Sequence, residues 1–241
     1  MLLEGEIVVI TGAGRGIGKA TALLFASEGA KVVLAARNRT QLEEVASHIA
    51  DLKGECLILP TDVSIENEVT ACFDQALGHF GRIDILINNA GVLYNGPFLE
   101  TSLEVWDQLL GVNLRGVILC TRAALPTMVA NGSGKIINVA SGAGLRGLPG
   151  GSVYAASKAA VIALGASLAG EVEANGIKVN TICPGPINTE MQNPSRHKDA
   201  VQKSSKLLPP DDVAGAALYL ASKLSGKTSG QTISVRTSNR W

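Results

Sequence analysis

The feature that most restricts the fold of this chain is a glycine-rich turn between a short apolar run and an amphipathic helical pattern. The apolar run at 7–11 leads into the letters TGAGRGIG at 11–18, close to the start of the chain. Such a turn lets backbone N–H groups approach a pyrophosphate, while the N-terminus of the following helix adds partial positive charge. Because this context is present, we predict dinucleotide binding at Gly12, Arg15, Gly16, Ile17 and Gly18.

The rest of the chain alternates strand and helix patterns. Short runs rich in β-branched residues predict seven strands, at 7–11, 31–36, 56–60, 83–87, 135–139, 178–183 and 231–235. Apolar residues at three- to four-residue spacing predict helices at 17–28, 39–52, 66–79, 102–129, 152–175 and 210–222. We therefore expect an α/β fold with a single Rossmann-type, doubly wound, parallel seven-stranded sheet and helices on both faces. Residues 1–241 should form one domain, with a substrate-covering segment at about 189–208.

Composition excludes several classes of function. The 21 Lys and Arg residues balance 21 Asp and Glu residues, so no basic surface for nucleic acid is expected. The opening residues carry Glu4 and Glu6 where a secretory signal would be positive, and no uninterrupted apolar run reaches the roughly 18 residues of a membrane span. Four cysteines and three histidines are scattered, which predicts no metal site. We expect a cytoplasmic protein.

The end of the second predicted strand indicates which dinucleotide binds. An acid about 20 residues beyond the glycines would bind the adenosine ribose hydroxyl of NAD. This chain has Arg37, Asn38 and Arg39 there instead, and the next acid is Glu43. A carboxylate would repel a 2′-phosphate, whereas arginine can bind one, and Arg15 can point to the same place. NADP(H) is therefore the favoured cofactor; the alternative is that Arg37 and Arg39 are solvated loop charges.

A tyrosine and a lysine share one face of the predicted helix at 152–175, because Tyr154 and Lys158 are four residues apart. Lowering the pKa of a phenol from about 10 to about 7 needs roughly 4 kcal/mol of preferential phenolate stabilisation. Two unit charges about 4 Å apart at an effective dielectric of about 20 interact by about that amount. A single Lys is therefore sufficient to activate Tyr154, although such a pair alone is more often an ordinary helix pair.

The chain closely resembles the short-chain dehydrogenase/reductase family, and in particular its 3-oxoacyl carrier-protein reductases and their relatives. Asn113, Ser141, Tyr154 and Lys158 have the order and spacing of the family's catalytic tetrad. Beyond the glycine turn, family motifs also match Asp62-Val63, Asn88-Asn89-Ala90-Gly91 and Pro184-Gly185-Pro186-Ile187-Asn188-Thr189. The resemblance covers nearly the whole chain and implies an NADP(H)-dependent oxidoreductase acting on a small carbonyl or secondary alcohol substrate.

The resemblance also implies a role for each matching residue. Tyr154 would donate a proton to the carbonyl oxygen, and Ser141 would hydrogen-bond the same oxygen. Lys158 would bind the nicotinamide ribose and lower the pKa of Tyr154, and Asn113 would hold a water that links Lys158 to solvent. The remaining predicted cofactor contacts are Asp62, Val63, Asn89, Ala90, Gly91, Ile187 and Thr189.

Two questions stay open at this stage. The long apolar helices at 102–129 and 152–175 suit pairing across a twofold axis, so a homodimer or a homotetramer is expected. A protein that binds the cofactor as a sensor or scaffold, without useful turnover, is the alternative to an enzyme. The complete set of four catalytic residues is needed only for turnover, and it favours the enzyme.

Overall fold

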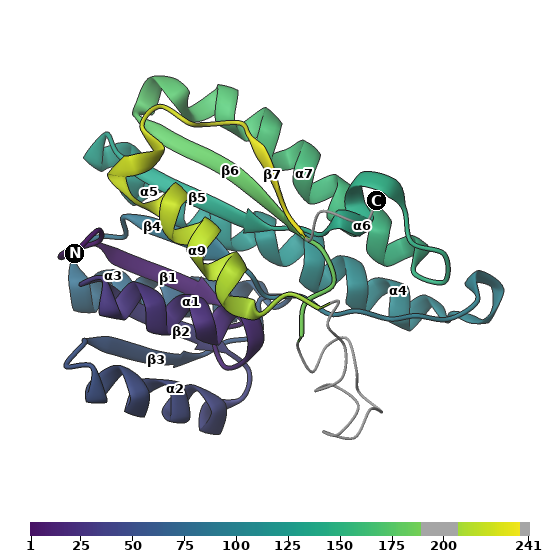
Figure 1. Ribbon diagram of the computed structural model, residues 1–241, viewed down its shortest axis with the longest axis horizontal. Helices are drawn as coiled ribbons and strands as arrows, with labels where there is room; N and C mark the ends of the chain where they lie inside the picture. Colours follow the sequence, from purple (N-terminus) through teal and green to yellow (C-terminus); the bar gives the residue numbers. More distant parts are fainter. Residues whose placement is uncertain (189–206, 237–241) are drawn as a thin grey trace.

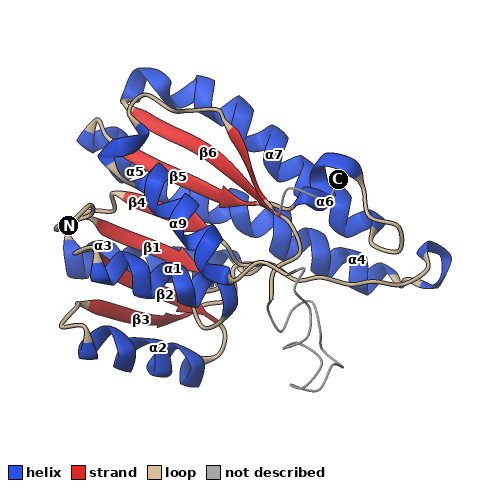
Figure 2. Cartoon of the chain, viewed as in Figure 1, coloured by secondary structure: helices blue, strands red, loops and turns tan. Residues whose placement is uncertain are grey.

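The computed structural model describes residues 1–188 and 207–236 of the chain. Seven parallel strands form one sheet in the order β3-β2-β1-β4-β5-β6-β7 (Figures 1 and 2). The strands are β1 (Ile7–Thr11), β2 (Lys31–Ala36), β3 (Cys56–Pro60), β4 (Ile85–Asn88), β5 (Gly134–Val139), β6 (Ile177–Pro184) and β7 (Thr232–Val235). The predicted Rossmann-type sheet is therefore confirmed, and each strand begins and ends within two residues of its predicted limits.

Helices cover both faces of this sheet, as predicted (Figure 1). One face carries α1 (Gly16–Ser27), α2 (Arg39–Asp51) and α9 (Pro210–Ala221). The other carries α3 (Glu66–Phe80), α5 (Gly116–Asn131) and α7 (Ser152–Val172), with α4 (Leu103–Leu110) beside α7. Single 3-10 turns lie at Phe98–Glu100, Glu173–Asn175 and Lys223–Ser225.

The interior strand β1 is apolar on both faces, and both of its faces are buried. In β1, Val8 and Ile10 pack with the α1, α2 and α9 side, whereas Val9 packs with the α3, α5 and α7 side. All three side chains are fully buried. An interior parallel strand therefore reads as an unbroken apolar run without polar alternation.

The predicted helix at 102–129 differs from the structure. It is divided into α4, a π-helical segment at Gly111–Arg115, and α5. Apolar spacing continues through all three, so periodicity alone could not reveal the change of hydrogen-bonding register. Sequence reasoning also missed α6 (Gly142–Arg146), a short helix that begins immediately after Ser141.

Two helical stretches, Leu103–Asn131 and Ser152–Asn175, are long and apolar enough to cross a membrane by length and composition alone. The prediction of no membrane span was based on uninterrupted apolar runs, whereas these two stretches are apolar enough by their mean hydropathy. Core helices of globular proteins pass the same test, and both α5 and α7 pack against the sheet. The two stretches are therefore weak evidence for a membrane span.

Candidate active site

A cleft with a volume of about 840 Å³ crosses the carboxyl ends of the strands. It lies where β1 pairs with β2 on one side and with β4 on the other, which is the switch point at which open α/β sheets bind ligands. The predicted site residues that line it are Gly12, Arg15, Gly16, Ile17, Arg37, Asp62, Val63, Asn89, Ala90, Gly91, Ser141, Tyr154, Lys158 and Ile187. Gly18 and Asn113 lie behind this lining, and Thr189 is outside the described residues.

The glycine turn has the geometry that its sequence predicts. Gly12 and Gly16 adopt φ values of +66° and +54°, which residues with side chains rarely adopt. A β-carbon on Gly18 would lie 2.1 Å from the Gly12 carbonyl oxygen, so Gly18 serves close packing of α1 on the turn. The first turn of α1 contains no acidic residue that would repel a bound anion.

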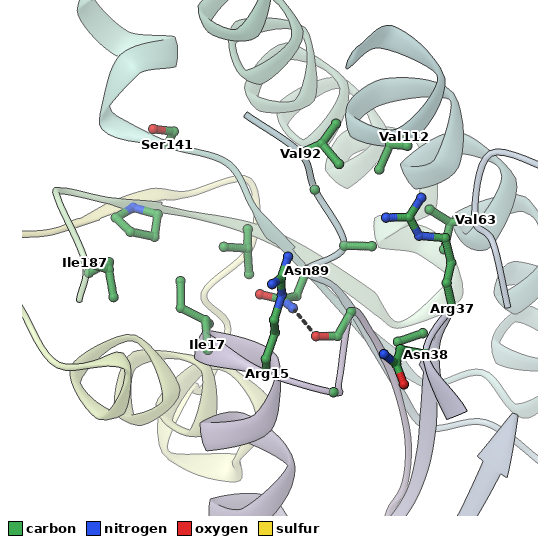
Figure 3. Close-up of a pocket in the computed structure, with 18 of the residues that line it drawn as sticks. Arg15, Ile17, Arg37, Asn38, Val63, Asn89, Val92, Val112, Ser141 and Ile187 are labelled. Carbon is green, nitrogen blue, oxygen red and sulfur yellow. Dashed lines mark hydrogen bonds between the residues drawn. The ribbon is translucent and has the colours of Figure 1, made fainter. Parts of the chain in front are cut away.

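Polar side chains attach this turn to the end of β4. The Asn89 side-chain amide donates to the carbonyl oxygens of Thr11 and Gly12, at 2.9 and 3.2 Å, and Figure 3 draws one of these bonds. The Thr11 hydroxyl accepts from the backbone N–H groups of Asn89 and Ala90, both at 3.0 Å. Sequence reasoning left Thr11 out of the site, although a hydroxyl at the end of a buried strand was a usable signal.

Arginine side chains surround the end of the cleft at β2. Arg15 comes from the glycine turn and Arg37 from the end of β2 (Figure 3). The Nη1 atom of Arg37 lies 3.9 Å from Oδ2 of Asp62, and Arg37 is largely exposed, so this ion pair is weak. The Asn38 side chain caps α2 by accepting from the Gln41 N–H at 3.1 Å. This end of the cleft can therefore bind an anionic group.

Three of the four predicted catalytic residues lie at the opposite end of the cleft. Ser141 follows β5 and begins α6, where its hydroxyl accepts from the Ala143 N–H at 3.1 Å. Tyr154 and Lys158 come from the first part of α7 and are 9% and 4% exposed. The Lys158 ammonium donates to the carbonyl oxygen of Val139 at 2.9 Å, which holds α7 against β5.

Burial controls the ionisation of these groups. It raises the pKa of Tyr154, and a side-chain hydrogen bond with Ser141 lowers it by a smaller amount. Burial also lowers the pKa of Lys158 to about 8. Desolvation of the phenolate is the larger of the two effects on the pKa of Tyr154, and the lowering of that pKa by Lys158 stays a prediction. Tyr154 is held in its protonated form at neutral pH.

Asn113 lies in the π-helical segment and is fully buried. Its Oδ1 accepts from the Val92 N–H, and its Nδ2 donates to the Val92 carbonyl oxygen and to the Ser157 hydroxyl. A β-carbon on Gly91 would lie 3.3 Å from Asn113 Oδ1 and 3.4 Å from Lys158 Nζ. The space beside Gly91 therefore borders both groups, and a water there that links Lys158 to solvent stays a prediction.

Ser157 is a further polar residue that sequence reasoning missed. It is fully buried on α7, and its hydroxyl donates to the Tyr154 carbonyl oxygen at 2.7 Å while it accepts from Asn113 at 3.2 Å. Its position three residues after Tyr154 placed it on the same helical face. It connects the helix of the Tyr–Lys pair to the π-helical segment.

The titratable residues outside this site form no metal-binding group. Across residues 1–188 and 207–236, no cluster of three His, Cys, Asp or Glu side chains has a suitable arrangement. The four cysteines are free thiols. Burial raises the pKa of Cys183 to about 11 and that of Cys120 to about 12, so both thiols are unreactive at neutral pH.

Comparison with known proteins agrees with this geometry. The family model described as short chain dehydrogenase matches residues 6–200. An uncharacterized oxidoreductase of Staphylococcus aureus (strain MRSA252) is 38% identical over 218 residues, which cover 90% of this chain and 91% of the relative. The 3-oxoacyl-[acyl-carrier-protein] reductase FabG of Thermotoga maritima is 36% identical over 241 residues, 98% of each chain. A crystal structure of a short-chain type dehydrogenase/reductase from Mycobacterium marinum superimposes with a TM-score of 0.91 at 36% identity, covering 97% of this chain and 95% of that one.

Proposed function

Because the chain belongs to the short-chain dehydrogenase family of nicotinamide-dependent oxidoreductases, we propose that it is an NADP(H)-dependent enzyme acting on a carbonyl or secondary alcohol substrate. One observation carries the proposal. Ser141, Tyr154 and Lys158 converge at one end of the cleft, while Arg15 and Arg37 line the other. The two ends thus offer proton chemistry and phosphate binding in one continuous site.

The protein groups fit such a cofactor. The Gly12 to Gly16 turn and the N-terminus of α1 would bind the pyrophosphate, and Lys158 would bind the nicotinamide ribose. When bound, the cofactor supplies hydride transfer at its nicotinamide ring. Asp62 and Val63 would contact the adenine. Asn89, Ala90 and Gly91 would line the ribose on the adenosine side and the path of the cofactor's backbone. Ile187 and Thr189 would contact the carboxamide.

Tyr154 is the proposed acid in carbonyl reduction. A phenol has a pKa of about 10 in water and burial raises that of Tyr154, so its O–H keeps its proton at neutral pH and can donate to the substrate oxygen. Ser141 would hydrogen-bond the same oxygen and stabilise the charge that develops there. In the oxidative direction Tyr154 would act as the base, and a protonated Lys158 beside it would favour the phenolate.

Preference for NADP(H) over NAD(H) rests on charge at the β2 end of the cleft. Three arginines among the described residues line the cleft, and of these Arg15 and Arg37 offer planar donors for a 2′-phosphate. The segment that follows β2 carries no acid that would accept from a ribose 2′-hydroxyl. Asp62 is the competing partner of Arg37, but at 3.9 Å and with Arg37 largely exposed this pair is weak enough for a phosphate to replace it.

A panel of ketones and secondary alcohols, assayed with NADPH and NADH at the absorbance band of reduced nicotinamide, tests the function. We expect turnover of at least one carbonyl compound, faster with NADPH. Tight NADPH binding without turnover of any compound would favour the alternative, a cofactor-binding sensor or scaffold. Absence of binding to either cofactor would contradict both.

We also propose that the protein is a cytoplasmic homodimer or homotetramer. Several large apolar side chains of α4 and α5 are exposed, including Leu103, Leu110, Ile118 and Val129. Exposed large apolar side chains on two successive helices suit an oligomer contact. Light scattering coupled to size-exclusion chromatography should give a mass of twice or four times that of the chain, and a monomeric mass at micromolar concentration would contradict the proposal.

A further inference from the structure

The short helix α6 touches the backbone of α7 directly. A β-carbon on Gly144 would lie 2.8 Å from the carbonyl carbon of Lys158, 2.8 Å from the backbone nitrogen of Ala159 and 3.0 Å from the Lys158 carbonyl oxygen. Gly144 is absent from the glycines with positive φ, so the requirement here is for space and not for an unusual conformation. Any side chain at this position would meet backbone atoms, which cannot rotate away.

Gly144 is also rigidly joined to Ser141. Its N–H donates to the Ser141 carbonyl oxygen at 3.0 Å, and the Ser141 hydroxyl accepts from the Ala143 N–H within the same turn. On the other helix, Lys158 is attached to the carbonyl oxygen of Val139 in β5. The separation of α6 from α7 at Gly144 is therefore linked to the position of Ser141 relative to Tyr154.

An added methyl group would disturb this arrangement by a predictable amount. Ordinary contact between carbon atoms occurs at roughly 3.5–4.0 Å, so α6 and α7 would have to separate by roughly 0.5–1 Å at Gly144. Alanine is a better helix former than glycine. Loss of activity in a Gly144→Ala variant would therefore come from the contact with α7 and not from weakened helix formation.

We propose that Gly144 is a positioning residue, whose missing side chain lets α6 lie on α7 and so sets the Ser141 hydroxyl against Tyr154. The proposal rests on the proposed oxidoreductase function. It extends that function by assigning a residue that touches neither the substrate nor the cofactor and acts through Ser141.

The same helix provides a matched control. A β-carbon on Gly142 would lie 3.4 Å from the Pro184 carbonyl oxygen and 3.7 Å from the Arg146 side chain, which are ordinary contacts. Gly142→Ala and Gly144→Ala thus add the same methyl group two residues apart, and only the second meets the backbone of α7.

The test compares wild type, Gly142→Ala, Gly144→Ala, Ser141→Ala and the Ser141→Ala/Gly144→Ala double variant. Single-turnover reduction, with enzyme in excess over substrate, keeps slow variants measurable. We expect Gly144→Ala to slow reduction by roughly 10- to 100-fold and Gly142→Ala to stay within about 2-fold of wild type. NADPH affinity should be unchanged in both. The double variant should be no slower than Ser141→Ala, because both substitutions remove the same interaction.

A pH profile separates positioning from general loosening. The Ser141 hydrogen bond lowers the pKa of Tyr154, so its loss should move the midpoint for alcohol oxidation to higher pH. In Gly144→Ala this pH midpoint should move in the same direction as in Ser141→Ala, and in Gly142→Ala it should not move.

Three results would overturn the inference. The first is a wild-type rate in Gly144→Ala, and the second is a double variant that is slower than Ser141→Ala by the full factor seen in Gly144→Ala. The third is a Gly144→Ala variant that no longer binds NADPH and no longer unfolds cooperatively. The last would mean that the contact supports the fold and not the serine. Failure of the proposed function itself would be seen separately, as absence of turnover in the wild-type protein.

Discussion

The side-chain amide of Asn113 bonds both backbone polar groups of Val92. Its Oδ1 accepts from the Val92 N–H at 2.8 Å, and its Nδ2 donates to the Val92 carbonyl oxygen at 2.9 Å. A third bond, from Nδ2 to the Ser157 hydroxyl at 3.2 Å, reaches α7. One buried residue therefore joins the segment after β4, the π-helical segment and the helix that carries Tyr154.

Replacing Asn113 by Ala should destabilise the protein. The change leaves the two partly buried backbone groups of Val92 without their partner, so the free energy of unfolding should fall by about 1–3 kcal/mol. Urea titration followed by circular dichroism measures the change. The control is Asn131→Ala, at the exposed end of α5, with an expected effect within about 0.5 kcal/mol. Equal stabilities of the two variants would refute the assigned bonds.

Replacing Tyr154 by Phe should abolish carbonyl reduction while NADPH binding persists. The phenol is the proposed proton donor, and loss of a general acid costs roughly 10²- to 10⁴-fold in rate. The cofactor affinity, measured by nicotinamide fluorescence, should change by less than about 2-fold, since the aromatic ring remains. Tyr219→Phe, on the exposed side of α9, is the control and should behave as wild type. Wild-type turnover in Tyr154→Phe would remove the residue from the proton step.

Replacing Arg37 by Asp should shift the cofactor preference toward NADH. Loss of a charge-assisted bond to a 2′-phosphate and introduction of a repelling carboxylate should change the NADPH/NADH ratio of kcat/KM by roughly 10- to 100-fold or more. The same substitution at Arg122, an exposed residue of α5 outside the cleft lining, should leave the ratio unchanged. An unaltered ratio in Arg37→Asp would exclude Arg37 from the phosphate site.

Lys158 should make stability depend on pH above neutrality. Burial lowers its pKa from 10.5 to about 8, so the unfolded chain holds the proton more tightly than the folded protein. Stability should therefore rise as the pH increases from about 8 to about 10.5, by about 3 kcal/mol in all. This contribution is lost as the pH falls back through the same window.

Lys158→Met lacks this titration, so its denaturation midpoints at pH 8 and pH 10 should show a smaller rise than those of the wild type. Lys227→Met, at an exposed position, provides the control and should retain the wild-type rise. A rise of equal size in Lys158→Met would show that other groups cause the dependence. Activity should be lost in Lys158→Met at both pH values.

Local patterns were sufficient to predict the sheet, most helices and the glycine turn, whereas much of the cleft lining was predicted from the resemblance to the family. The glycine turn at 11–18 and the apolar runs of the strands are formed by residues that are close together in the sequence. Their spacing can therefore be recognised without the tertiary structure. Tyr154 and Lys158 could be placed together because a helix face repeats every three to four residues, whereas Ser141 was expected only from the resemblance to the family.

Other features were decided by contacts between segments far apart in the chain. Within the π-helical segment Asn113 bonds Val92, and no periodicity of apolar residues indicates that pairing. The need for glycine at 144 arises from the backbone of Lys158 and Ala159, which only the docking of α6 on α7 brings close.

The sequence by itself determined the order of strands and helices, the glycine turn and the identity of the chemical groups at the cleft. Tertiary structure alone decided how the pKa values of these groups are shifted. The pKa of Tyr154 is raised, and that of Lys158 is lowered, because residues from several elements exclude water from both side chains. Desolvation is a property of the assembled environment, so it is absent from any local run of residues.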